Sequence, residues 1–261
     1  MMCEILCVMF PQPERFARVL PWALELERFG IAGFGWGVAW LDQGRVMGYR
    51  NPGSLSQDVP GQERLAEVQS HCFLVHLRRP SKLSTIEMAN TQPFVQEDGW
   101  FAFCHNGMFE RHLEFRPAFE ASLRGRADSE VGFRLLEDML QHQPPEVAIP
   151  VVHHRLGGQA NLAYLESDGR LLLYGGHAQN MLWTCRIADW WVATTALHSA
   201  DRSVFDWVFP EAKQWRRVDQ EGVCFGMTDA GQRSFERSLH GSCVTPSGVG
   251  EISHGYFGPH G

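Results

Sequence analysis

Short apolar stretches rich in β-branched and aromatic residues dominate the first hundred positions of the chain. They end at Pro, Gly or Asn, a pattern typical of strands, and predict strands at residues 3–10, 37–41, 45–50, 71–77 and 100–104. The same pattern returns after Gly157-Gly158 and predicts strands at residues 160–166, 170–175, 181–186 and 190–195, separated by turn signals such as Ser167-Asp168-Gly169.

Between these groups of strands, apolar residues recur at helical spacing. Residues 13–29 predict a helix that starts at Pro13 and Glu14. A second helix is expected from Asp128, whose side chain is placed to act as the N-cap. Pro144-Pro145 ends that helix and predicts the start of another, through residue 156.

The order of strands, helices and strands favours an α+β fold with two sheets and helices on the outside, because each sheet must bury one face. No repeat or linker interrupts the chain before residue 240, so residues 2–239 are expected to form a single domain. Residues 240–261 are poor in large apolar side chains and rich in Gly, Ser, Pro and His, which predicts a flexible tail.

The composition narrows the classes of protein. A content of 44% hydrophobic and 20% charged residues is that of an ordinary globular protein, and a net charge of −7 argues against nucleic acid or anionic membrane as partner. No apolar stretch near the start approaches the ~20 residues that span a bilayer, and no Lys or Arg precedes Arg15 to form a secretory signal. Seven cysteines without framework spacing fit reduced thiols, so a cytoplasmic location is expected.

Cys3 is the first candidate for chemistry. A cysteine in a terminal strand is most often a small apolar core residue. If translation begins at Met2 and that methionine is removed, however, Cys3 carries a free α-amine with an unperturbed pKa of about 7.7–8.0. That amine can accept the proton of the thiol of Cys3, so nucleophile and base would belong to one residue.

The tripeptide His105-Asn106-Gly107 follows a predicted strand. Asn-Gly is a favoured tight turn, which is one reading of the motif. The other is an oxyanion hole, in which the side-chain amide of Asn106 and a backbone N–H at Gly107 stabilise developing negative charge.

Two further elements carry charge. Arg78 and Arg79 end a predicted strand, where paired arginines are usually solvated, but a guanidinium also clamps a carboxylate with two parallel hydrogen bonds. Asp128, at a loop-to-helix junction, can pair with an ammonium group. Together they describe a site for the α-amino acid end of a substrate.

The sequence resembles the class II glutamine amidotransferases, a group of N-terminal-nucleophile hydrolases, and within them the stand-alone type without a fused synthase. The resemblance covers roughly residues 2–235. Its motifs, in the family's order and at similar spacing, are Cys3, Gly35-Trp36-Gly37, His76-Leu77-Arg78, Asn90-Thr91-Gln92-Pro93-Phe94, His105-Asn106-Gly107 and Asp128-Ser129-Glu130. Three positions differ from the usual pattern. Phe34 stands where relatives have a polar residue, Gln92 stands where His is usual, and Thr194-Thr195-Ala196-Leu197 matches the family's small polar turn only loosely.

The resemblance implies a four-layer αββα sandwich with the active site at one edge of the two sheets. It implies that Cys3 is the nucleophile, with its own α-amine as base, and that Asn106 and Gly107 form the oxyanion hole. Arg78 would bind the α-carboxylate of glutamine and Asp128 its α-ammonium group, with Arg79 as a wall of the same pocket. No cofactor is implied, and the partners are a glutamine-like small molecule and an ammonia-accepting enzyme.

Several alternatives remain open at this point. The same site could cleave a γ-glutamyl bond in a larger thiol or peptide metabolite. Alternatively, the protein could be a catalytically silent binding or partner subunit that keeps only the fold. A papain-like site would use Cys104 or Cys72 with a distant His. A metal site is not expected, because no ligand pairs at zinc spacing occur, and His153-His154 is predicted to lie on a helix surface.

Overall fold

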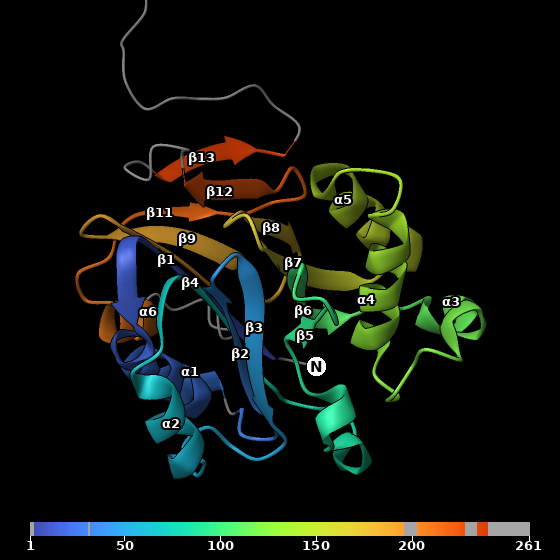
Figure 1. The fold of residues 1–261 in the computed structure, drawn as a ribbon, viewed down its shortest axis with the longest axis horizontal. Coiled ribbons are helices and arrows are strands. Elements are labelled where there is room, and N and C mark those ends of the chain that lie inside the picture. The colour runs from blue at the N-terminus through green and yellow to red at the C-terminus, as the bar shows by residue number, and fades with distance from the viewer. Residues whose placement is uncertain (1–2, 31, 196–202, 228–233, 240–261) are drawn as a thin grey trace, which may run out of the picture.

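A computed structural model of the 261-residue chain describes residues 3–30, 32–195, 203–227 and 234–239 (Figure 1). The predicted tail at 240–261 lies outside the described residues, as do Met1 and Met2. Among the described residues, none of the helices combines the length and the apolar character needed to cross a membrane.

Two antiparallel sheets form the centre of the molecule. The first has seven strands in the order β11 (Lys213–Arg217), β9 (Leu182–Ile187), β10 (Trp190–Thr195), β1 (Glu4–Arg15), β4 (Gln69–Leu77), β2 (Trp36–Asp42) and β3 (Arg45–Asn51). The second has six, in the order β13 (Ser234–Ser238), β12 (Val223–Met227), β8 (Leu171–Gly176), β7 (Gln159–Glu166), β6 (Phe101–Met108) and β5 (Phe94–Val95).

Helices cover the outer faces of both sheets, as Figure 1 shows. On the side of the first sheet lie α1 (Leu20–Gly30), α2 (Val59–Ala66), α6 (Ser203–Val208) and the short helix η1 (Phe16–Arg18). On the side of the second lie α3 (His112–Phe119), α4 (Asp128–Met139) and α5 (Pro145–Leu156). Two short helices, η2 (Leu83–Thr85) and η3 (Met88–Asn90), follow β4. The predicted four-layer αββα arrangement is confirmed.

The period-2 alternation of the strands divides the core into layers. On β1, Leu6, Val8 and Phe10 pack toward the helices of the first sheet. The alternate residues of β1, which are Ile5, Cys7 and Met9, pack between the sheets with Cys72 and Leu74 of β4 and with Ala102 and Cys104 of β6. The side chains that face the space between the sheets are therefore those at odd positions of β1 and at even positions of β4 and β6.

The predicted start of the first helix is wrong. Pro13 and Glu14 belong to β1, which continues to Arg15 because a shift of register lets Glu14 and Arg15 pair with β4 beyond an irregular stretch. The helix α1 starts at Leu20, so Pro21 occupies its first turn, where a backbone N–H has no helical partner to lose.

Two local predictions in the second half of the fold also change. Asn106 and Gly107 do not form a turn, because β6 continues through them to Met108 in register with β7. His153 is buried rather than on the helix surface, since its Nδ1 lies 3.1 Å from the hydroxyl of Tyr174 on β8, while the neighbouring His154 is exposed.

The burial of His76 predicts acid sensitivity. Burial lowers the pKa of His76 to about 3, with the charges of His105 and Arg78 acting in the same direction. Below the unfolded pKa of about 6.5 the unfolded chain therefore binds a proton that the folded chain does not, and the free energy of unfolding falls with falling pH by up to about 1.4 kcal/mol per pH unit. Urea unfolding at pH 7, 6 and 5 measures the free energy of unfolding at each pH. In His76→Leu this free energy should fall less steeply with falling pH, by up to that amount per pH unit.

His142→Leu, at an exposed position, is the matched control and should keep the slope of the unsubstituted protein. Equal slopes for His76→Leu and the unsubstituted protein would contradict this account of the acid sensitivity.

Candidate active site

Cys3 lies immediately before β1 and continues the alternation of Ile5 and Cys7, so it belongs to the layer between the sheets. Only 6% of the residue is exposed. The backbone N–H of Arg79 donates a hydrogen bond to Sγ of Cys3 at 3.4 Å, and the thiol lies 3.8 Å from the carbonyl oxygen of Arg79. The end of β4 thus fixes the position of the sulfur atom.

The surroundings of Cys3 keep its thiol protonated near neutral pH. Burial raises the pKa of the thiol to about 11, and it outweighs the opposite effects of the Arg79 N–H and of the positive charge of Arg78. Because only the thiolate is an effective nucleophile, attack by Cys3 requires a base at short range.

A chain of amide groups lies beside Cys3. Asn106, fully buried on β6, donates a short hydrogen bond from Nδ2 to the carbonyl oxygen of Cys3. Its Oδ1 accepts a hydrogen bond of 2.8 Å from Nδ2 of Asn161 on β7. Asn180 also donates from Nδ2 to the carbonyl oxygen of Cys3, at 3.5 Å. The amide of Asn106 is thereby oriented, and a primary amide has a second N–H available for another acceptor.

Gly107 follows Asn106 in β6 and has a φ of 131°, a conformation that side chains rarely adopt. A Cβ atom at this position would lie 2.0 Å from the carbonyl oxygen of Gln159 on β7. Only glycine fits here, so the backbone beside Asn106 stays open to close approach.

Asp128 does not cap its helix. It is the first residue of α4, and the position before it is Ala127, which has no capping side chain. Oδ2 of Asp128 instead accepts a hydrogen bond of 2.8 Å from the backbone N–H of Phe109 and lies 3.8 Å from Nε2 of His105. The carboxylate is held at the end of β6, and 11% of the side chain remains exposed.

His105 lies beside the carboxylate of Asp128 without a hydrogen bond to it. Its ring stacks on Phe109 with a centroid distance of 4.3 Å. Burial lowers the pKa of His105, and the negative charge of Asp128 only partly offsets that effect. A neutral imidazole beside Asp128 leaves the negative charge of this carboxylate without a full counter-charge.

Arg78 is 5% exposed and is anchored from two sides. Its Nη2 donates to Oγ1 of Thr85 at 2.8 Å, and its Nη1 lies 3.5 Å from the carbonyl oxygen of Phe34. Burial lowers the pKa of Arg78, while the charges of Cys3, Glu87 and Asp128 act in the opposite direction. Arg78, Cys3 and Asp128 are therefore close enough to share one electrostatic environment.

The contact of Arg79 with Cys3 is made by its backbone, whereas the sequence suggested a role for its side chain. Phe34 contributes through its backbone too, since its N–H donates to the carbonyl oxygen of Arg78 at 3.3 Å. A polar side chain at position 34 is not needed for this contact.

Four buried amide side chains support the site, and the sequence analysis assigned a role to none of them. Asn161 and Asn180 lie beside Cys3, as described above. Gln92 pairs with the backbone of His105, accepting from its N–H at 2.7 Å. Buried amides within apolar strands, such as Asn161 in β7, are the signal that could have indicated them.

Asn90 joins two segments of the site. Its Oδ1 accepts hydrogen bonds from the backbone N–H groups of Arg126 and Ala127, at 2.8 and 2.9 Å. Its Nδ2 donates to the carbonyl oxygen of Thr85 at 3.0 Å. The loop after β4, which anchors Arg78, is thus tied to the residue that precedes Asp128.

The other cysteines considered as nucleophiles lie deeper. Cys72 and Cys104 are at most 1% exposed within the layer between the sheets. Burial raises the pKa of Cys72 to about 12 and that of Cys104 well above its usual range. Neither fits a papain-like site. The described residues contain no cluster of three or more His, Cys, Asp or Glu that could hold a metal ion.

Solved structures of other proteins share this fold. The glutamine phosphoribosylpyrophosphate amidotransferase from B. subtilis, solved with ADP and GMP, superposes with a TM-score of 0.68 at 16% identity, over 92% of this chain and 50% of that one. A glutamine aminotransferase class-II domain protein from Silicibacter pomeroyi gives a TM-score of 0.59 at 18% identity, over 92% of this chain and 100% of that one.

Sequence comparison agrees. The glutamine–fructose-6-phosphate aminotransferase (isomerizing) of Thermus thermophilus is 44% identical over 52 residues, which are 19% of this chain and 9% of that protein. The match thus spans a small part of the relative's length. The family model of class-II glutamine amidotransferases matches residues 2–209, most of the chain. The chain therefore belongs to the class II glutamine amidotransferases.

Proposed function

We propose that the protein hydrolyses the side-chain amide of glutamine, or of a γ-glutamyl compound, with Cys3 as the nucleophile. The observation that supports this most directly is the convergence of the Cys3 sulfur, the Asn106 amide and the charges of Arg78 and Asp128 at one end of the layer between the sheets. Membership of the family supports the same general activity.

The base in this proposal is the α-amine of Cys3 itself, freed by removal of the residues before it. The buried thiol, with its pKa of about 11, needs such a base at neutral pH. The amine takes the proton of the thiol, and the thiolate attacks the amide carbon. The negative charge on the oxygen is stabilised by the second N–H of the Asn106 amide and by the backbone N–H of Gly107.

Collapse of the tetrahedral intermediate breaks the carbon–nitrogen bond, and the α-ammonium group gives its proton to the departing nitrogen. The products of this step are ammonia and a γ-glutamyl thioester on Cys3. A water molecule then attacks the thioester, loses a proton to the α-amine, and releases glutamate and the thiol.

Arg78 and Asp128 would bind the two charged groups at the α-carbon of the substrate. The guanidinium of Arg78 pairs with the α-carboxylate and the carboxylate of Asp128 with the α-ammonium group. The side chain of Arg79 would form a wall of the same pocket. The ammonia would pass to a separate ammonia-accepting enzyme, or, with a larger γ-glutamyl substrate, another amine would leave in its place.

Substitution of the nucleophile tests the activity. Cys3→Ala should lower glutamate release from glutamine by at least about 10³-fold, because the remaining groups stabilise the transition state but cannot form the thioester. Cys185→Ala, in the core beneath the helices of the first sheet, is the control and should keep most of the activity. An unsubstituted protein that is inactive on glutamine and on γ-glutamyl peptides would favour a catalytically silent subunit.

The pH dependence of alkylation tests the base. In protein that retains Met2, the rate of iodoacetamide labelling at Cys3 should rise about tenfold per pH unit from pH 7 to 10, because the pKa of the thiol is about 11. In processed protein the α-ammonium group lowers that pKa, so the rate should level off at lower pH. Peptide mass spectrometry measures both rates. Identical profiles for the two forms would rule out the α-amine as base.

Asp128→Asn tests the binding of the ammonium group. Asparagine can still accept the N–H of Phe109 but lacks the charge, so the KM for glutamine should rise about tenfold or more while kcat changes much less. Asp138→Asn, an exposed position on the same helix, should leave both constants unchanged. An unchanged KM in Asp128→Asn would remove this residue from the substrate site.

A further inference from the structure

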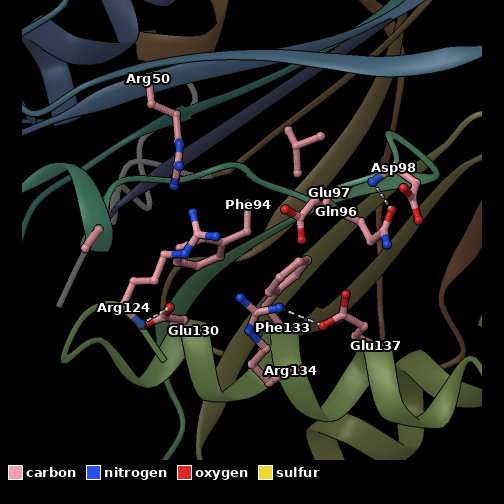
Figure 2. A pocket seen from close by; sticks show the side chains of 12 residues that line it. Arg50, Phe94, Gln96, Glu97, Asp98, Arg124, Glu130, Phe133, Arg134 and Glu137 are labelled. Carbon is pink, nitrogen blue, oxygen red and sulfur yellow. Dashed lines mark hydrogen bonds and ion pairs between the residues drawn. The ribbon is translucent and has the colours of Figure 1, made fainter. Parts of the chain in front are cut away.

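A cavity lies beside the segment that carries Gln92. It is a cavity of about 290 Å³ between the ends of β3 and β5 and the helix α4. Figure 2 shows three guanidinium groups approaching it, those of Arg50 on β3, of Arg124 in the loop before α4 and of Arg134 on α4, with the rings of Phe94 and Phe133 between them. None of these residues has a role in the proposed hydrolysis.

Two of the three guanidinium groups have no carboxylate partner within the described part of the chain. Arg50 donates from Nη1 to the carbonyl oxygen of Thr91 at 2.8 Å, and its guanidinium carbon lies 5.9 Å from the ring centre of Phe94. Burial lowers the pKa of Arg50 and the nearby charge of Arg124 lowers it further, while the charge of Glu130 acts in the opposite direction. Arg134, by contrast, forms an ion pair of 2.7 Å with Glu137.

Among the described residues, none of the acidic side chains that line the cavity forms an ion pair with Arg50 or Arg124, although the charge of Glu130 acts on Arg50 from nearby. Glu137 is occupied by Arg134, and Glu130 accepts the backbone N–H groups of Arg124 and Gly125, both at 2.7 Å. The side chain of Asp98 points away from the guanidinium groups in Figure 2. Glu97 is exposed, and its carboxylate faces the same space from the opposite side.

We propose that this cavity binds the phosphate group of a small organic phosphate. Two guanidinium charges without a carboxylate partner match the charge of a phosphate monoester dianion. Their approach from separate elements suits a tetrahedral group, whose oxygens accept hydrogen bonds from several directions. The rings of Phe94 and Phe133 give the remainder of such a ligand an apolar surface. The volume of the cavity limits the ligand to a small metabolite.

The phosphate site and the proposed glutamine site share a wall. Arg50 binds the carbonyl oxygen of Thr91, whose neighbour Gln92 pairs with His105. On the other side of the cavity, Glu130 holds the loop that leads to Asp128. The phosphate site does not depend on the proposed hydrolysis, because it shares neither Cys3 nor Arg78.

Direct binding tests the proposal. Isothermal titration of the full chain with phenyl phosphate and with inorganic phosphate, at constant ionic strength, should show one saturable site. Phenyl phosphate should bind more tightly than inorganic phosphate, and phenol should not bind detectably. Arg124→Gln should weaken phenyl phosphate binding about tenfold or more, since it removes a charged hydrogen-bond donor. Glu97→Gln should strengthen binding severalfold, because it removes a negative charge that faces the ligand.

Two controls locate the ligand. Arg155→Gln, at an exposed position of α5 outside the cavity, should leave the dissociation constant unchanged. Arg78→Gln should also leave it unchanged, because Arg78 belongs to the glutamine site. Loss of binding in Arg78→Gln, equal binding in Arg124→Gln and the unsubstituted protein, or no saturable binding at all would each overturn the proposal. None of these results depends on whether the protein hydrolyses glutamine.

Discussion

The face-to-face packing of the two sheets is the constraint on which the candidate site depends. Alternate residues of β1 and β6 enter the apolar layer between the sheets, and the same alternation brings Cys3 and Asn106 to the end of that layer. Burial there raises the pKa of the Cys3 thiol, so the packing that stabilises the fold also keeps this thiol protonated near neutral pH. Burial in this one layer therefore both stabilises the fold and determines the protonation of Cys3.

Most of the architecture was predictable from the sequence because alternation and turn residues act locally. The four strands predicted after Gly158 correspond to β7, β8, β9 and β10 and lie within one residue of their predicted bounds, whereas β11, β12 and β13 were not predicted. The first helix was predicted too early because Pro13 and Glu14 also suit the start of a helix. This segment stays extended because Glu14 and Arg15 pair with β4, more than fifty residues away in the chain, and no local pattern carries that information.

Part of the candidate site was also predictable from the sequence, and part was not. Cys3, Arg78, Asn106 and Asp128 belong to motifs that can be read in the sequence, and the structure brings their charges and amides together. Their supports could not be read in this way. The partner of Asp128 is a backbone N–H at Phe109, and Arg79 acts through its main chain, so side-chain identity gives no indication of either contact.

Asn90 fixes the distance between Arg78 and Asp128. Arg78 is anchored to Thr85, Thr85 to Asn90, and Asn90 to the backbone just before Asp128. The distance between the charges of Arg78 and Asp128, which would bind the two charged groups at an α-carbon, is therefore set by the amide of Asn90, and this amide need not touch the substrate. The ability to distinguish amino acids from molecules with differently spaced charges would then depend on Asn90 and its hydrogen bonds. A substitution at Asn90 could change this specificity during evolution while every residue that contacts the substrate stays the same.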